Sequence, residues 1–157
     1  MPDLITVGMG ELKTGGQGDT LAAYGIGSCV VIVCYDRIKP VAAMLHGMLP
    51  EKPAKKADSN RYIDCGIENL VKAMLDAGSG INTMEAKFFG GARMFDVKQE
   101  GESIGDRNAK KAREALEKKG IKITGQDTGS TYGRNIEYSV KDRQAVIRSF
   151  MSGTKTL

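Results

Sequence analysis

The chain has 157 residues, of which 41% are hydrophobic and 27% charged, and its formal net charge is +4. This length predicts one globular domain over residues 1–157 and is too short for two domains of ordinary size. No apolar stretch could cross a bilayer and no secretion signal opens the chain, so we expect a cytoplasmic protein that is not membrane-embedded. With five Tyr, four Phe and no Trp, and no interleaving of aromatic and basic residues, nucleic-acid binding is not expected.

Short apolar segments rich in β-branched residues predict seven or eight strands. In chain order they cover residues 4–7, 20–24, 30–35, 41–45, 84–89, 121–124, 135–140 and 144–150. The segment 30–35 is apolar throughout, which is typical of a strand buried on both faces within a sheet. The Gly-rich segment 14–18 is expected to be a loop.

Two segments have helical periodicity. Ser59 is the expected N-cap of a helix that runs to about Asp76, and Gly78 is its expected stop. A second helix is expected from about Asp106 to Lys119, closed by Gly120. Together with the strands, these helices predict a single layered α+β domain.

Cys29 and His46, the only histidine, form a candidate catalytic pair. A turn centred on Arg37 and Ile38 would place the two residues directly opposite each other, about 5 Å apart at Cβ. An imidazole at that distance can take the proton of a thiol and make it a nucleophile. A longer turn would change the register, and the same residues also suit a packed cysteine and a histidine without a catalytic role. The spacing leaves both interpretations open.

Backbone groups next to Cys29 suit the same chemistry. Gly25 and Gly27 let the chain bend and leave space for a substrate, and Gly27, Ser28 and Cys29 carry N–H groups that could face an oxyanion.

The sequence does not predict a metal site. Cys29 and Cys34 are an odd number of residues apart on one strand and so point to opposite faces, and no spacing resembles a zinc ligand set. Cys34 and Cys65 are expected to be buried, inert thiols, and an odd number of cysteines excludes a complete disulfide framework.

The order of several short motifs resembles a known family, the chemoreceptor glutamine deamidases, or CheD family. The resemblance covers nearly the whole chain. Its motifs are residues 25–30 (GIGSCV), 43–50 (AMLHGMLP), 61–64 (RYID), 89–95 (FGGARMF), 104–108 (IGDRN), 127–129 (DTG), 133–134 (GR) and 137–138 (EY).

The resemblance implies hydrolysis of receptor glutamine side chains to glutamate, with release of ammonia, and in some members receptor methylester hydrolysis. It places the nucleophile at Cys29 and the histidine at His46, with no cofactor. It also implies a three-layer α/β/α sandwich of mixed, largely antiparallel sheets and two main helices, similar to the cytotoxic necrotising factor toxins. The implied partners are the chemoreceptor cytoplasmic domain and CheC, a response-regulator phosphatase.

One position departs from the family pattern. Ala23 stands where the family usually has a threonine that helps to orient the histidine. A backbone carbonyl or a nearby hydroxyl such as Thr20 would have to replace it, or activity would be reduced. The alternative function is therefore a regulatory binding module for a CheC-like phosphatase. A transglutaminase would share the thioester, and only the family resemblance separates the two.

Overall fold

The computed structural model describes residues 3–94, 101–149 and 151–157, which form two five-stranded sheets and two α-helices. The outer sheet has the order β1–β3–β8–β9–β10, and the central sheet has the order β2–β5–β4–β6–β7. The outer strands are β1 (Leu4–Thr6), β3 (Thr20–Ile26), β8 (Arg134–Ser139), β9 (Gln144–Ser149) and β10 (Gly153–Thr156). The central strands are β2 (Leu12–Gly15), β5 (Ala42–Gly47), β4 (Val30–Asp36), β6 (Met84–Gly90) and β7 (Lys122–Thr128). The helices are α1 (Ile63–Asp76) and α2 (Ile104–Lys118), and a 3-10 turn at Ile81–Thr83 precedes β6.

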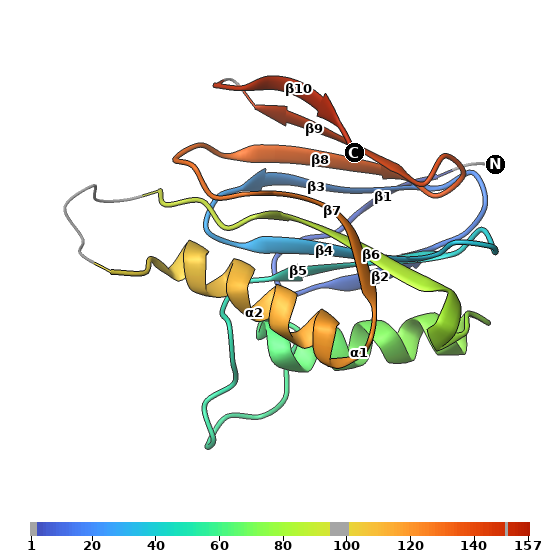
Figure 1. Ribbon diagram of the computed structural model, residues 1–157, viewed down its shortest axis with the longest axis horizontal. Helices are drawn as coiled ribbons and strands as arrows, with labels where there is room; N and C mark the ends of the chain where they lie inside the picture. Colours follow the sequence, from blue (N-terminus) through green and yellow to red (C-terminus); the bar gives the residue numbers. More distant parts are fainter. Residues whose placement is uncertain (1–2, 95–100, 150) are drawn as a thin grey trace.

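The molecule has three layers in the order outer sheet, central sheet, helices (Figure 1). The predicted α+β class is confirmed, but the predicted α/β/α order is wrong, because both helices cover the same face of the central sheet. The apolar sequence of the central strands predicts that both of their faces are covered, but it does not tell whether a helix or a second sheet covers each face. A second sheet, and not a helix, covers the other face. Similarity to the necrotising factor toxins stays a prediction.

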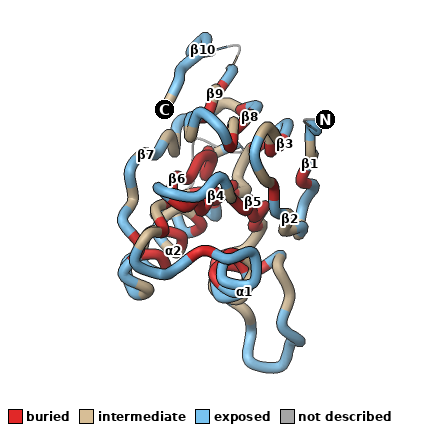
Figure 2. The backbone as a smooth tube through the Cα atoms, turned by 90° about the vertical axis from the view of Figure 1, so that its right-hand side faces the viewer, coloured by how far each residue is buried: buried red, intermediate tan, exposed pale blue. Residues whose placement is uncertain are grey.

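Alternation along β4 divides its side chains between two cores. Val30 and Ile32 face the helices, whereas Val31, Val33 and Tyr35 pack between the sheets. Every residue of β4 and β5 is buried (Figure 2), as expected for strands covered on both sides. Both sheets are mixed, because β1 runs parallel to β3 and β6 runs parallel to β7.

All eight predicted strand segments overlap observed strands, but β2 and β10 were not predicted. The first half of the expected loop at 14–18 belongs to β2, an edge strand that pairs with β5. All four residues of β10 are exposed, so this strand has no apolar pattern to mark it. β9 ends at Ser149, and Phe150, which the prediction included, lies outside the described residues, as does Phe95.

The helix boundaries differ from the predictions for local reasons. The N-cap of α1 is Tyr62 and not Ser59, since Arg61 O accepts bonds from Met48 N and Leu49 N and holds this segment extended. α2 begins at Ile104, two residues early, because Ser103 and Asp106 form a capping box. In the described ranges, neither helix has the length and hydropathy needed to span a membrane.

Candidate active site

Cys29 and His46 lie at the same end of the central sheet and on the same side of it. His46 is on β5 opposite Val31, and this ladder ends with Val30 opposite Gly47. Cys29 directly precedes β4, and it packs against the cluster between the sheets that includes Val31. Residues two apart on a strand share a face, so Cys29 and His46 are diagonal neighbours, which typically lie about 7–8 Å apart at Cα.

The predicted register, with Cys29 directly opposite His46, is wrong. Tyr35 pairs with Ala42, so the connection is longer than a turn centred on residues 37–38. The Asp36 carboxylate accepts the N–H groups of Ile38 and Lys39, both at 2.8 Å, and stabilises this longer turn. The register shifts by two residues. Since a shift of two leaves every side chain on its original face, Cys29 and His46 still point to the same side.

A backbone carbonyl fixes the His46 ring. His46 is 4% exposed, and its Nδ1 lies 3.1 Å from Val7 O. A carbonyl can only accept, so Nδ1 must carry the proton, and Nε2 of the neutral ring is left with a free lone pair. The backbone of His46 is held as well, by bonds from Gly10 N to His46 O (2.9 Å) and from His46 N to Glu11 O (3.0 Å). The ring therefore has the tautomer that a general base at Nε2 requires.

Burial shifts the two titrating groups in opposite directions. It lowers the pKa of His46 below the ordinary value, an effect that the Val7 carbonyl and the charge of Glu11 partly offset. It raises the pKa of the Cys29 thiol, partly offset by the residue's own backbone N–H. Both directions favour a neutral thiol beside a neutral imidazole at pH 7. Cys29 is thus a thiol that needs a base to become a nucleophile.

The loop before Cys29 is fixed against the end of β6. Ala92 N donates to Gly27 O (2.9 Å), and Gly91 N donates to Cys29 O (2.8 Å). Gly90 has φ +113°, and a Cβ there would lie 2.3 Å from Cys29 O. Only glycine permits this approach, so Gly90, at the end of β6, and Gly91, which follows it, set the position of the Cys29 backbone.

The remaining predicted site residues have different positions. Gly27 and Ser28 lie on the loop that enters β4. Ala23 and Val7 are both buried in the cluster between the sheets. Val7 directly follows β1, and its N–H donates to Ala22 O. Thr20 is three residues earlier on β3, and alternation directs its side chain to the opposite face from Ala23. Val7 O, and not the Thr20 hydroxyl, contacts the His46 ring.

Two further groups contribute to the site, Val7 O and Asn108. A backbone carbonyl was one of the alternatives expected to orient His46, but nothing in the sequence identified Val7, and Asn108 was not predicted as a site residue. Asn108 is fully buried on α2, and its Nδ2 donates to Ser28 O (2.9 Å) and Met48 O (3.0 Å). The sequence could have indicated Asn108. It is a polar residue on the buried stripe of α2, with Gly105, Ala112 and Leu116, where an apolar residue is expected.

The other two cysteines lie away from this site. Cys34 is buried in the core beneath the helices, as expected, and burial raises its pKa to about 12. The expected burial of Cys65 is wrong, because this residue lies on α1 and is only partly buried. The predicted opposite orientation of Cys29 and Cys34 is confirmed. Over the described ranges, no three His, Cys, Asp or Glu side chains are grouped so as to hold a metal ion.

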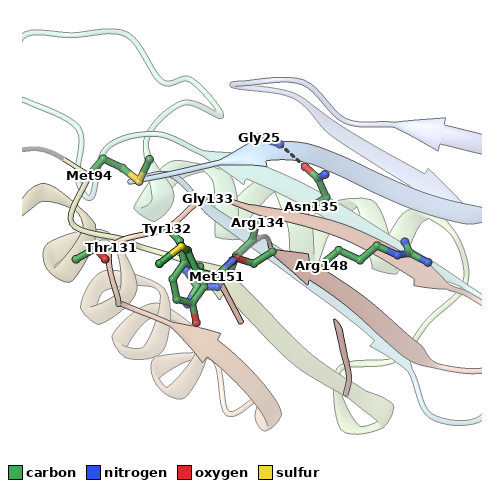
Figure 3. A pocket seen from close by; sticks show the side chains of 10 residues that line it. Gly25, Met94, Thr131, Tyr132, Gly133, Arg134, Asn135, Arg148 and Met151 are labelled. Atoms are coloured by element: carbon green, nitrogen blue, oxygen red, sulfur yellow. Dashed lines mark hydrogen bonds between the residues drawn. The ribbon is translucent and has the colours of Figure 1, made fainter. Parts of the chain in front are cut away.

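A pocket of about 690 Å³ adjoins the Cys29 loop. Figure 3 shows Met94 at one end and Arg148 at the other, with Tyr132, Arg134 and Met151 between them. Gly25, near the end of β3, lines the pocket, and its N–H donates to Asn135 Oδ1 (2.8 Å). Met94 also covers Gly27, since a Cβ on that glycine would lie 3.0 Å from Met94 Cγ.

Comparison with known proteins supplies the family. Residues 48–149 match the model of the CheD family, described as CheD chemotactic sensory transduction. A protein of Haloarcula marismortui named "Probable chemoreceptor glutamine deamidase CheD" is 37% identical, over 99% of this chain and 91% of its own length. Proteins with the same name from Caldanaerobacter subterraneus (38% identical, 97% of this chain, 96% of theirs) and Thermococcus kodakarensis (36%, 95% and 94%) also match. The chain belongs to the CheD family of chemotactic sensory transduction proteins.

Proposed function

We propose that this protein deamidates glutamine side chains of chemoreceptors, with Cys29 as nucleophile and His46 as base. The observation that carries the proposal is the bond between His46 Nδ1 and Val7 O, because it leaves Nε2 available on the side of the sheet that Cys29 faces. The names of the relatives support the substrate, and the location of the protein would then be the cytoplasm.

The mechanism follows from the neutral pair. His46 Nε2 takes the Sγ proton as the thiolate attacks the glutamine Cδ, which forms a tetrahedral oxyanion next to the backbone N–H groups of the Cys29 loop. The C–N bond then breaks, the His46 proton passes to the departing nitrogen, and ammonia leaves a thioester. A water molecule, deprotonated by His46, attacks the thioester and releases glutamate, and Cys29 regains its proton. The steps use protein groups and water only.

The pocket beside the loop would receive the receptor segment that flanks the target glutamine. Met151 lines this pocket and is 77% exposed, so Met151→Glu places a charge there without touching the core. We expect KM for a receptor fragment to rise about tenfold, as the loss of one apolar contact predicts, with kcat within twofold of wild type. Ile38→Glu, an equally drastic change in the turn at the far end of β4, is the control and should leave both constants unchanged.

The activity itself is tested by incubating the protein with a receptor cytoplasmic domain and measuring glutamine-to-glutamate conversion by peptide mass spectrometry. Site-specific conversion that depends on the protein is the expected result. If no glutamine changes while the protein is folded and the receptor domain is helical, the proposal is wrong.

Ala23 favours a second candidate, a regulatory module that binds a CheC-like phosphatase with weak or vestigial catalysis. The same assay, run with and without CheC, separates the candidates. A deamidase that CheC restrains converts glutamine alone and loses rate when CheC is added. A module converts glutamine slowly or not at all in either condition, yet it binds CheC and changes phosphatase turnover.

A further inference from the structure

Asn108 bridges the two strand ends that carry the candidate catalytic residues. The β4–β5 ladder ends at Val30 and Gly47, and just beyond it the Asn108 amide donates to Ser28 O (2.9 Å) and to Met48 O (3.0 Å). Ser28 precedes Cys29, and Met48 follows His46 by two residues. One side chain thus fixes the backbone on both sides of the site.

The orientation of this amide is determined by chemistry. Both partners are carbonyl oxygens, which only accept, so the NH2 group must face them and Oδ1 must point away. Asn108 Oδ1 is buried and has no hydrogen-bond partner among the described residues. The buried stripe of α2 would accept an apolar side chain without that cost, so the two donors account for the presence of an amide.

The bond to Ser28 O also determines where the next N–H points. The Ser28–Cys29 peptide is trans, so its N–H is directed opposite to its C=O. The carbonyl points to α2, on the helix side of the central sheet, and the Cys29 N–H therefore points toward the other side, where the Cys29 side chain packs. In agreement with this direction, the N–H of Cys29 lowers the pKa of its own thiol.

The helix that carries Asn108 is itself placed by a close backbone contact. A Cβ on Gly105 would lie 2.3 Å from Ala92 O, and Ala92 N donates to Gly27 O. The first turn of α2 therefore packs against the segment that follows β6, and this segment in turn bonds the Cys29 loop. Asn108 cannot shift relative to Ser28 without displacing this assembly.

We propose that Asn108 is a positioning residue that holds the Ser28–Cys29 peptide with its N–H toward the reacting carbonyl, as an oxyanion donor, and keeps the Cys29 loop in register with His46. The proposal rests on the deamidase function above. It assigns Asn108 no contact with the substrate. Its effect is on the transition state and not on substrate binding.

The test compares Asn108→Ala and Asn108→Ser with wild type in steady-state deamidation of a receptor fragment. For Asn108→Ala we expect kcat to fall about 10–100-fold and KM to stay within twofold, somewhat less than complete loss of an oxyanion donor. Asn108→Ser keeps one hydroxyl donor and should lose less. Ser103→Ala, which removes the N-cap of the same helix, is the matched control for destabilised α2 and should keep the wild-type kcat per folded molecule.

Alkylation of Cys29 by iodoacetamide as a function of pH gives a readout that does not depend on deamidation. We expect the apparent pKa of Cys29 to rise in both Asn108 variants and to stay unchanged in Ser103→Ala. If the wild type shows no deamidation, the proposed function fails. The alkylation profile then still tests whether Asn108 positions the Ser28–Cys29 peptide. Wild-type kcat per titrated Cys29, or an unchanged alkylation profile, in folded Asn108→Ser would overturn the proposal.

Discussion

The proposed catalytic pair, Cys29 and His46, differs from a preformed thiolate–imidazolium pair, because burial acts on both residues. It raises the pKa of Cys29 and lowers that of His46, so the neutral forms dominate near pH 7. Val7 O selects the ring tautomer that can accept the thiol proton. Ala23 therefore does not leave His46 without a partner, since the Val7 carbonyl bonds Nδ1 of the ring and orients it.

The pH dependence of kcat/KM follows from these shifts. As pH falls through the lowered pKa of His46 the base is lost, so the acid limb should lie below the ordinary histidine value of 6.5. As pH rises through the raised pKa of Cys29 the pair loses the proton that ammonia needs, so the alkaline limb should lie above 9.0. Glu11→Gln should move the acid limb still lower, because the charge of Glu11 raises the His46 pKa. An acid limb above 6.5 would argue against the neutral pair.

At the scale of elements, the end of β6 determines where the Cys29 loop can lie. Gly90→Ala combines a left-handed φ of +113° with a Cβ 2.3 Å from Cys29 O, so the loop must move. We expect a loss of about 3 kcal/mol in the free energy of unfolding, measured by urea denaturation, together with loss of deamidation by the folded protein.

Gly78→Ala is the control for this substitution. Gly78 follows α1 with φ +98°, yet nothing lies within 4 Å of a Cβ there. Only the backbone strain should remain, at about 1 kcal/mol, with activity intact. Equal losses of stability and activity in the two variants would show that the contact with Cys29 O has no special role.

The sequence predicted elements where periodicity is strong and missed them where tertiary contacts decide. The apolar strands β4 and β5 were found, whereas β2 and β10 have few buried side chains to mark them. Cys29 and His46 share a face for any register that differs from the predicted one by an even number of residues. Their register depends on the Asp36 turn, and the Asn108 and Val7 contacts come from segments distant in the chain.

At the scale of the whole molecule, Arg134, which also lines the pocket, links the two sheets. Its guanidinium, from β8, is fully buried and bonds Asp127 Oδ2 of β7 at 3.0 Å and Gly129 O at 3.0 Å. Lys155 of β10 approaches the other Asp127 oxygen at 3.1 Å. The layer order could not be predicted, because such long-range contacts between sheets produce no hydrophobic periodicity in the sequence.

Arg134→Met should therefore be costly. Removing one member of a buried pair typically costs about 3–5 kcal/mol, and Lys155 should keep the loss near the lower end. Arg148→Met removes an exposed partner of Glu137 in the same sheet and should cost less than about 1 kcal/mol. Urea denaturation of both variants measures the difference, and equal losses would contradict a structural role for the buried pair.

The most direct test of the central claim is the rate of receptor glutamine conversion by Cys29→Ala beside Cys65→Ala. Cys65 lies on α1 and is the matched thiol outside the site. We predict that Cys29→Ala loses about 10⁴-fold or more in rate while remaining folded, as expected for removal of a nucleophile, and that Cys65→Ala retains the wild-type rate. Conversion that persists in Cys29→Ala, or that disappears in Cys65→Ala alone, would contradict the assignment of Cys29.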